Sequence, residues 1–213
     1  FPGKTLADLN GKPMLERQIE RIKKSKYVDQ IVVATTTNNE DDLIVKWCEN
    51  NEINYFHGPC DDVLGRLFQA ATFFSSEIII EILGDNPLVH SEMIDSIVNI
   101  YLNNSFDYVA NLTSEYPETE RMAQFPRGVR VQVFSYETLR KCENLAKDEF
   151  HREHATSYIA SNPDIFSTGF LKAEDCYANC NRPDFNLAVN EQKHLILVSK
   201  IFELCEAYES NFS

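Results

Sequence analysis

The sequence lacks any long hydrophobic run, internal repeat or low-complexity segment. A transmembrane helix needs roughly 18 or more apolar residues in a row, and the 213-residue chain contains no such stretch, so we expect no membrane span. No signal peptide is visible after Phe1. The length suits one sizeable hydrophobic core, and we therefore expect a single domain over residues 1–213.

Positive charge is scarce. The chain has 20 lysines and arginines against 33 aspartates and glutamates, which gives a formal net charge of −13. A nucleic-acid-binding surface needs a basic face for the phosphate backbone, so this balance argues against a nucleic-acid partner. It does not argue against a nucleotide ligand, because a divalent metal can supply positive charge locally.

Closely spaced cysteine pairs are also scarce. Of the six cysteines, only Cys176 and Cys180 lie near each other, with three residues between them. This spacing is not typical of a zinc site or of a redox pair. We therefore expect reduced thiols and a cytoplasmic protein.

Residues 77–88, EIIIEILGDNPL, are the most informative stretch of the sequence. Their apolar run predicts a buried strand, and Gly84 and Pro87 predict its end. Asp85 then follows the carboxyl end of the strand, where open α/β sheets bind ligands, so it is a candidate for a metal-facing or phosphate-facing residue. Alternatively, Asp85 only closes the turn or caps the next helix.

The rest of the chain alternates between strand and helix patterns. In the first half this alternation predicts an α/β fold with a parallel sheet covered by helices on both faces. Hairpin-like strands in the second half predict a mixed sheet, and the polar segment 112–128 predicts a substrate loop or lid. We expect strands at residues 30–37, 53–56, 77–83, 106–111, 129–134, 165–171 and 185–189, and helices at 13–26, 39–50, 63–74, 91–102, 135–146, 150–160 and 191–208.

Eight segments, taken in order, resemble a known family. They are FPGK (1–4), GKPMLERQIERIKKS (11–25), QIVVATTTN (30–38), DDVLGRLFQA (61–70), EILGDNPLV (81–89), DYVANL (107–112), VRVQVFS (129–135) and REHATSYI (152–159). The chain resembles the cytidylyltransferases of bacterial and archaeal surface-polysaccharide synthesis, specifically the spore-coat polysaccharide protein F group. These are relatives of the enzymes that make CMP-activated sialic, pseudaminic and 3-deoxy-octulosonic acids.

The resemblance implies a nucleotide-diphospho-sugar transferase fold, a Rossmann-like three-layer sandwich around a mostly parallel, partly mixed sheet. It implies Mg²⁺-dependent transfer of CMP from CTP to a sugar, with a homodimer as one candidate assembly. Such a reaction depends on positioning and charge neutralisation more than on covalent chemistry. Magnesium bridges the phosphates, and a basic residue holds the leaving pyrophosphate.

The resemblance also implies functional residues. Lys4 matches the lysine that ends the phosphate-binding loop, and Asp85 matches the metal-binding aspartate. An acidic helix start matches the segment near the base, and a further set matches positions that face the sugar. The structural alternative for the first set is an ordinary helix N-terminus. For Arg152, Glu153 and His154 of the second set it is a charged helix surface or a salt-bridged interface. The first set is Asp61, Asp62, Val63, Leu64 and Arg66, and the second is Asn111, Arg127, Arg152, Glu153 and His154.

The sequence departs from the family pattern in three places. The first strand and its glycine-rich loop, expected upstream of residue 1, are not in the sequence. Asn190 stands where relatives have a second metal-binding aspartate, and an amide binds Mg²⁺ less strongly than a carboxylate does. Arg130 and Gln132 stand where many relatives have acids.

These departures leave alternatives open. One is a catalytically weak nucleotide-sugar-binding or regulatory protein, and another is a glycosyltransferase on a similar fold. The arginines suggest an acidic acceptor, because Arg127 and Arg130 could each pair with a carboxylate or phosphate through two hydrogen bonds. Alternatively, both are surface residues that pair with neighbouring acids.

Overall fold

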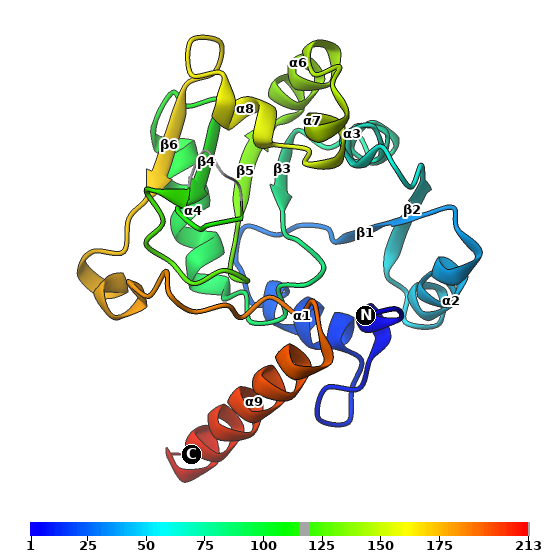
Figure 1. Cartoon of the computed structure of the whole chain (residues 1–213), viewed down its shortest axis with the longest axis vertical. Coiled ribbons are helices and arrows are strands. Elements are labelled where there is room, and N and C mark those ends of the chain that lie inside the picture. Colours follow the sequence, from blue (N-terminus) through cyan, green and yellow to red (C-terminus); the bar gives the residue numbers. More distant parts are fainter. Residues whose placement is uncertain (116–119, 213) are drawn as a thin grey trace.

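A computed structural model of the protein describes residues 1–115 and 120–212 (Figure 1). It confirms the α/β class. The strands are β1 (Val32–Thr36), β2 (Asn54–Gly58), β3 (Ile78–Glu81), β4 (Tyr108–Asn111), β5 (Gln132–Ser135) and β6 (Thr168–Leu171). The α-helices are α1 (Met14–Ile22), α2 (Asp42–Asn50), α3 (Val63–Phe73), α4 (Ser91–Asn103), α6 (Tyr136–Leu145), α7 (Glu149–Glu153), α8 (Ser157–Ser161) and α9 (Gln192–Phe212). Short 3-10 helices are η1 (Lys4–Leu6), η2 (Asn39–Asp41) and η3 (Asp175–Cys180).

Capping side chains fix where several helices begin. Asp62 accepts a hydrogen bond from the backbone N–H of Gly65 at the start of α3, at 2.8 Å. Ser135 accepts one from Thr138 at the start of α6, at 3.0 Å. The first N–H groups of a helix have no partner inside the helix, so an aspartate or serine at this position stabilises the helix start.

The described strands form two sheets. β1 pairs with β2 in parallel, as the alternating pattern predicts. The second sheet has the order β3-β5-β4-β6, in which β5 is antiparallel to β3 and β4, and β4 is parallel to β6. The mixed sheet expected in the second half is therefore confirmed.

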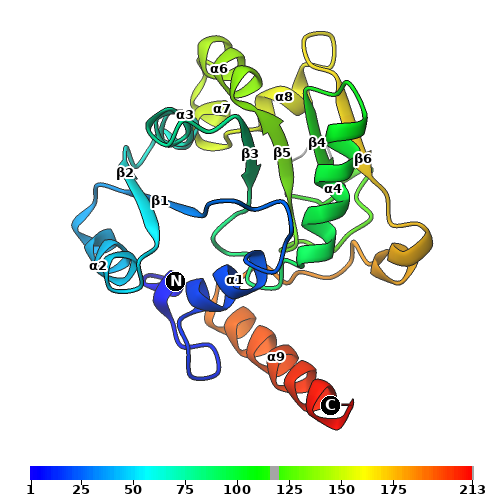
Figure 2. The same cartoon turned by 180° about the vertical axis from the view of Figure 1, so that it is seen from behind.

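Helices cover both faces of the larger sheet. Val109 and Val133 face the cluster built with α4, whereas their neighbours Tyr108 and Phe134 face the cluster built with α3, α6 and α8. Because successive side chains of a strand point to opposite faces, adjacent residues of β4 and β5 belong to different clusters. Seen from behind, α4 lies over β4 and β6 (Figure 2).

β1 and β3 each have one neighbouring strand in the part of the chain that the structure describes. β1 pairs only with β2, and β3 pairs only with β5, so each keeps one edge without a strand. A free edge presents backbone N–H and C=O groups that can pair with another strand.

α9 packs on the opposite end of the molecule from α6 (Figure 1). Its buried residues join a small core with residues that precede or begin α1. That core contains Leu9, Met14, Val189, Leu195, Val198 and Phe202. Within the described ranges, no helix is long and apolar enough to cross a bilayer.

The strand expected at residues 185–189 is wrong. Only one isolated bridge forms there, between Arg127 and Asn186. The backbone divides its hydrogen bonds between two segments, because Leu187 N–H donates to Arg127 O at 2.7 Å while Val189 N–H donates to Asp85 O at 2.9 Å. No single neighbour continues the ladder, so no strand results.

The helix expected at residues 150–160 is two short helices, α7 and α8. The backbone leaves helical geometry at His154, with φ −106° and ψ 75°. The Ser157 hydroxyl donates to the His154 carbonyl at 2.7 Å and also contacts His151 Nδ1 at 2.7 Å. Local side-chain bonds of this kind compete with the helical ladder, and the apolar spacing could not show them. The helix expected at 13–26 is likewise shorter, ending at Ile22.

Gly128 allows segments 127–128 and 185–188 to lie against each other. Its φ is +95°, and an added Cβ would lie 2.2 Å from Ala188 N and 2.4 Å from Leu187 C. No real Cβ tolerates backbone this close, and other residues rarely adopt this φ. Glycine at position 128 therefore lets the backbone of residues 187–188 pass close to it on the way to Asn190.

We predict that Gly128→Ala destabilises the protein by at least about 2 kcal/mol, because it combines backbone strain with a backbone clash. Chemical unfolding followed by circular dichroism measures the change. Gly84→Ala is the matched control, because nothing lies within 4 Å of a Cβ added there. Equal stability of the two variants would contradict the prediction.

Candidate functional site

Asp85 lies four residues beyond the end of β3, in a turn that residues far apart in the sequence hold in place. Val189 N–H donates to the Asp85 carbonyl at 2.9 Å. Gln18, buried on α1, donates to the carbonyls of Leu83 at 2.8 Å and Asn86 at 3.0 Å. Because both ends of the turn are bonded to other segments, the position of the Asp85 carboxylate is well defined.

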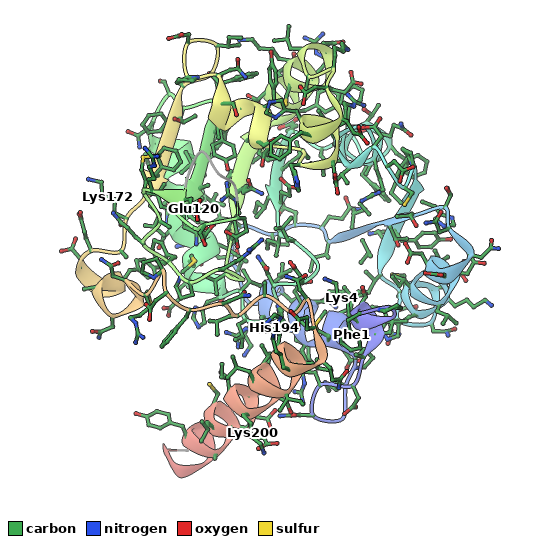
Figure 3. The ribbon with its side chains drawn as sticks, viewed as in Figure 1. Phe1, Lys4, Glu120, Lys172, His194 and Lys200 are labelled. Carbon is green, nitrogen blue, oxygen red and sulfur yellow. The ribbon has the colours of Figure 1, made fainter. Side chains whose placement is uncertain are left out.

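Lys4 and Asn190 meet Asp85 at this turn. Lys4 Nζ donates to Asn190 Oδ1 at 2.9 Å and lies 4.0 Å from Asp85 Oδ2. His194 Nδ1 accepts from the Asn190 N–H at 3.3 Å, and Figure 3 shows Lys4 and His194 on the same part of the molecule, where α9 begins. The structure therefore brings together the three residues that the sequence assigned to phosphate and metal.

Asn86, the residue after Asp85, is fully buried. In the orientation that satisfies both ends of its amide, it donates to Asp85 Oδ1 at 2.9 Å and accepts from the Arg130 backbone N–H at 3.1 Å. Neither Asn86 nor Gln18 was singled out from the sequence. For Gln18 a signal existed, since it is a polar residue within the apolar face of α1 formed by Leu15, Ile19 and Ile22.

Partial burial of the site raises the pKa of Asp85 above its ordinary value. The positive charges of Lys4 and Arg127 act in the opposite direction, whereas Glu115 adds to the increase. A carboxylate taken out of water favours a positive partner more strongly than an exposed one does. The turn therefore offers a place where a cation is stabilised.

The oxygen atoms at this turn fit a magnesium ion. Asp85 offers a carboxylate and Asn190 an amide oxygen, and hard cations such as Mg²⁺ prefer oxygen ligands. No group of three His, Cys, Asp or Glu side chains forms a metal cage among the described residues. A magnesium ion that binds nucleotide commonly uses one or two carboxylates, with phosphate and water as its other ligands.

The segment assigned to the base, residues 61–66, forms the start of α3. Asp61 is exposed, whereas Leu64 is fully buried in the core, and Val63 packs against the same core. Arg66 Nη1 donates to the Pro59 carbonyl at 2.6 Å. The side chains of Val63 and Leu64 are therefore structural, which leaves their backbone and Asp61 for any ligand.

Arg152 is held in a salt-bridged surface. It pairs with Asp62, and its Nη1 lies 3.2 Å from Glu143 Oε1. Although partial burial acts the other way, the Arg152 guanidinium lowers the pKa of Asp62. The structural alternative for Arg152 is thus observed, and the pair connects the start of α3 to α7.

The two residues that follow Arg152 differ in exposure. Glu153 is exposed, and the His154 ring packs on Phe150 with the ring centroids 4.7 Å apart. A contact of either with sugar stays a prediction.

Gly65 fits tightly beneath the pair of Asp62 and Arg152. A Cβ added to Gly65 would lie 2.2 Å from Asp62 Oδ2 and 2.8 Å from Arg152 Nη2. This tight fit explains the glycine in the segment DDVLGR (residues 61–66), because a side chain at position 65 would collide with the salt bridge.

Asn111 is buried and bonded at both ends of its amide to the 129–131 segment. Its Nδ2 donates to Val129 O at 3.0 Å, and its Oδ1 accepts from Val131 N–H at 2.9 Å. These bonds fix the backbone that leads into β5. Contact with a sugar, expected from the resemblance, stays a prediction.

The two arginines of the acceptor hypothesis lie in different environments. Arg127 is exposed, whereas Arg130 is only 1% exposed. Arg130 Nη1 donates to Thr113 Oγ1 at 2.9 Å and lies 3.9 Å from Glu115, and Nη2 donates to the Tyr108 hydroxyl at 3.0 Å. The expectation that both could be surface residues is therefore wrong for Arg130. Residues 116–119 of the expected loop lie outside the described residues.

The fold around this site is that of the nucleotidyltransferases. The structure of a cytidylyltransferase from Leptospira borgpetersenii superposes with a TM-score of 0.79, at 25% identity, over 90% of this chain and 76% of that one. A family model described as cytidylyltransferase matches residues 1–209. The chain belongs to the cytidylyltransferase family, and it is an enzyme of the nucleotidyltransferase class.

Two relatives by sequence cover most of the chain. "Uncharacterized protein MJ1063" of Methanocaldococcus jannaschii is 37% identical over 203 residues, which is 92% of this chain and 79% of that protein. The spore coat polysaccharide biosynthesis protein SpsF of Bacillus subtilis is 23% identical over 208 residues, which is 95% of this chain and 81% of that protein. The resemblance to the spore-coat group is confirmed.

Glu81 is a titratable group that the sequence did not single out. It is the last residue of β3, and its carboxylate accepts from Gln132 Nε2 at 3.0 Å. Burial of the carboxyl raises its pKa to about 7, although the Arg130 charge opposes this. The folded protein therefore holds the Glu81 proton more tightly than the unfolded chain does.

This pKa predicts a pH-dependent stability. The contribution of Glu81 is fully present below its ordinary value of 4.5 and is lost as the pH rises through about 7. We expect Glu81→Gln, which keeps an acceptor for Gln132, to be more stable than wild type at pH 8 by roughly 3 kcal/mol and similar to it below pH 4.5. Unfolding free energies measured across this range test the prediction.

The control for this prediction is Glu77→Gln, an exposed acid just before the same strand. It should follow the wild-type curve at every pH. If the difference between Glu81→Gln and wild type does not change with pH, the shifted titration is wrong.

Proposed function

We propose that this protein transfers CMP from CTP to an acidic sugar used in surface-glycan synthesis, in a Mg²⁺-dependent reaction. The observation that carries the proposal is the convergence of Lys4, Asp85 and Asn190 at the turn after β3. Family membership supports the class of reaction, and this geometry supports the choice of these three residues as the ones that handle its charge.

The transfer itself requires an in-line displacement. The acceptor oxygen attacks the α-phosphorus, and a new P–O bond forms as the bond to the β-phosphate breaks and pyrophosphate leaves. The acceptor hydroxyl releases its proton to water. Lys4 holds the charge of the leaving pyrophosphate. Asp85 and Asn190 would hold magnesium, which would neutralise phosphate charge.

The remaining parts of the proposal concern positioning. The start of α3, with Asp61 exposed and Asp62 anchored by Arg152, lies where we infer that cytosine is read. Glu153 and His154 follow Arg152 on the side assigned to the sugar. We propose a cytoplasmic protein with one nucleotidyltransferase-like domain.

A binding-only protein is the second candidate, and one observation favours it. The group at the second metal position is the Asn190 amide, already bonded to Lys4 at 2.9 Å, where relatives are expected to have a carboxylate. A weaker metal site could bind a nucleotide without supporting rapid transfer. Binding of CTP without turnover of any acceptor would favour this candidate.

The first prediction of this proposal concerns Asp85→Asn. We expect turnover with CTP and Mg²⁺ to fall by at least about 100-fold, because the variant loses the negative charge at the proposed metal site. The fold should persist, since partial burial disfavours the charged form of Asp85. Pyrophosphate release measures turnover, and thermal unfolding with each nucleotide measures binding.

In the same assay, wild type should be stabilised more by CTP than by ATP, GTP or UTP. Asp164→Asn, which changes an exposed aspartate, is the control and should match wild type. Near wild-type turnover of Asp85→Asn contradicts the metal assignment, and equal thermal shifts with all four nucleotides contradict the choice of CTP.

The second prediction concerns the acceptor and Arg127. Because Arg127 is exposed and its charge reaches Asp85, we expect it to pair with the acid group of the sugar. Arg127→Ala should reduce kcat/KM for acidic sugars by about 10-fold or more, as for loss of a charged hydrogen bond, and leave neutral sugars unchanged.

Arg121→Ala removes another exposed arginine from the same connection and serves as the control. It should not change acceptor preference. A loss that is equal for acidic and neutral sugars would mean that Arg127 acts through stability, and the acidic acceptor would then lose its support.

A further inference from the structure

Residues 83–86 form a tight turn with Asp85 at its third position. The Asn86 N–H donates to the Leu83 carbonyl at 3.1 Å, which is the bond between the first and fourth residues that closes a β-turn. The two central residues of this turn are Gly84 and Asp85. The direction of the Asp85 carboxylate therefore follows the conformation of the turn.

Gln18 holds both ends of this turn from α1. Its Nε2 donates to the first carbonyl of the turn, Leu83 O, at 2.8 Å, and to the last, Asn86 O, at 3.0 Å. A side-chain amide nitrogen carries two hydrogens, so both donors are in use. In both cartoon views α1 lies beside the chain that leaves β3 (Figures 1 and 2). One buried side chain therefore spans the turn that carries Asp85.

The two bonds from Gln18 do more than satisfy the backbone. The Leu83 carbonyl also accepts from the Asn86 N–H, and the Asn86 carbonyl also accepts from the Val89 N–H at 3.3 Å. Each carbonyl thus has a backbone partner in addition to Gln18, and one partner is what a buried carbonyl needs. What Gln18 adds is a fixed separation between the two ends of the turn.

The second proposed metal ligand is held against the same turn from another direction. Val189 N–H donates to the Asp85 carbonyl at 2.9 Å, and Asn190 is the next residue. A shift of the turn on the α1 side would therefore change how the Asp85 carboxylate lies relative to the Asn190 amide oxygen. Mg²⁺ demands near-ideal octahedral geometry, so such a shift weakens its binding.

The same helix also holds the chain that follows Lys4. The Ala7 N–H donates to the Lys4 carbonyl at 3.1 Å, and the N–H of Met14, the first residue of α1, donates to the Ala7 carbonyl at 2.9 Å. Both Lys4 and Asp85 are therefore attached to α1. For Asp85, the attachment is the side chain of Gln18.

We propose that Gln18 is a positioning residue for the magnesium site, because it holds the turn so that the Asp85 carboxylate and Asn190 can share one ion. This inference rests on the proposed function, which assigns Mg²⁺ to these two residues. Gln18 acts through Asp85 and is not itself a ligand. Groups that orient a metal ligand typically contribute roughly 10- to 100-fold to metal affinity.

The Mg²⁺ requirement of CTP binding tests the proposal. Gln18→Met removes both donors and keeps an unbranched side chain that suits a helix. The readout is the thermal shift with saturating CTP as Mg²⁺ is raised, taken as the Mg²⁺ concentration that gives half of the maximal shift. We expect Gln18→Met to need at least about 10-fold more Mg²⁺ than wild type. Without Mg²⁺, in the presence of EDTA, the two proteins should respond to CTP alike.

Ser25→Ala is the matched control. Ser25 is buried just beyond the end of α1, and its hydroxyl donates to Asp95 of α4 at 2.6 Å. The variant removes a buried hydrogen bond made by the same part of the chain but not to the turn, so it should keep the wild-type Mg²⁺ requirement whatever its melting temperature. Gln18→Asn, whose amide is one methylene shorter, replaces Gln18→Met if the latter does not fold, and the same increase is expected.

A double-mutant cycle tests whether Gln18 acts through Asp85. The cycle is measured up to Mg²⁺ concentrations that saturate Asp85→Asn. Adding Gln18→Met to Asp85→Asn should not raise the Mg²⁺ requirement further, because the carboxylate that Gln18 positions is already lost. If the two fold-changes multiply, Gln18 acts independently of Asp85 and the proposal is wrong.

The outcomes separate this inference from the proposed function. Equal Mg²⁺ requirements for Gln18→Met and wild type would overturn the positioning role and leave the proposed function intact. A wild type whose response to CTP does not depend on Mg²⁺ would overturn both. Mg²⁺-dependent binding of CTP without transfer of CMP would contradict the proposed transfer alone, because the comparison of Mg²⁺ requirements does not use turnover.

Discussion

The candidate site depends on how the buried backbone of one turn is satisfied. Residues 83–86 leave β3 and enter the interior, where an unpaired carbonyl would cost stability. Gln18 of α1 supplies donors to two of these carbonyls, and the Val189 N–H supplies one to Asp85. Segments separated by more than 60 residues therefore fix one carboxylate, and they bring Asn190 and Lys4 to it.

A second constraint lies beneath this turn, where charge is buried. Arg130 is almost completely enclosed, with Tyr108, Thr113 and Glu115 around its guanidinium. A buried charge is costly unless it is paired and hydrogen-bonded, and these three partners reduce that cost. Arg130 also connects to the site, because its backbone N–H bonds to Asn86, which bonds to Asp85.

Different interactions hold the two ends of the proposed site in place. At the phosphate end, hydrogen bonds to backbone hold the turn. At the end assigned to the base, a salt bridge between Asp62 and Arg152 joins α3 to α7 and lies directly over Gly65. The two aspartates of the DDVLGR segment therefore differ, because Asp62 is held in this salt bridge whereas Asp61 is exposed.

The sequence by itself determined the α/β class, most helices and strands, and the position of Asp85 after a strand end, because these follow from local periodicity and from the residues that end a strand. It also placed Lys4 and Asn190 with Asp85 through the family resemblance. Only the tertiary structure decided that Arg130 is buried and that Arg127 is exposed, since both follow the same loop and have the same chemistry. It also decided that residues 185–189 form no strand, because their hydrogen-bond partners, Arg127 and Asp85, come from distant segments that no local pattern reveals.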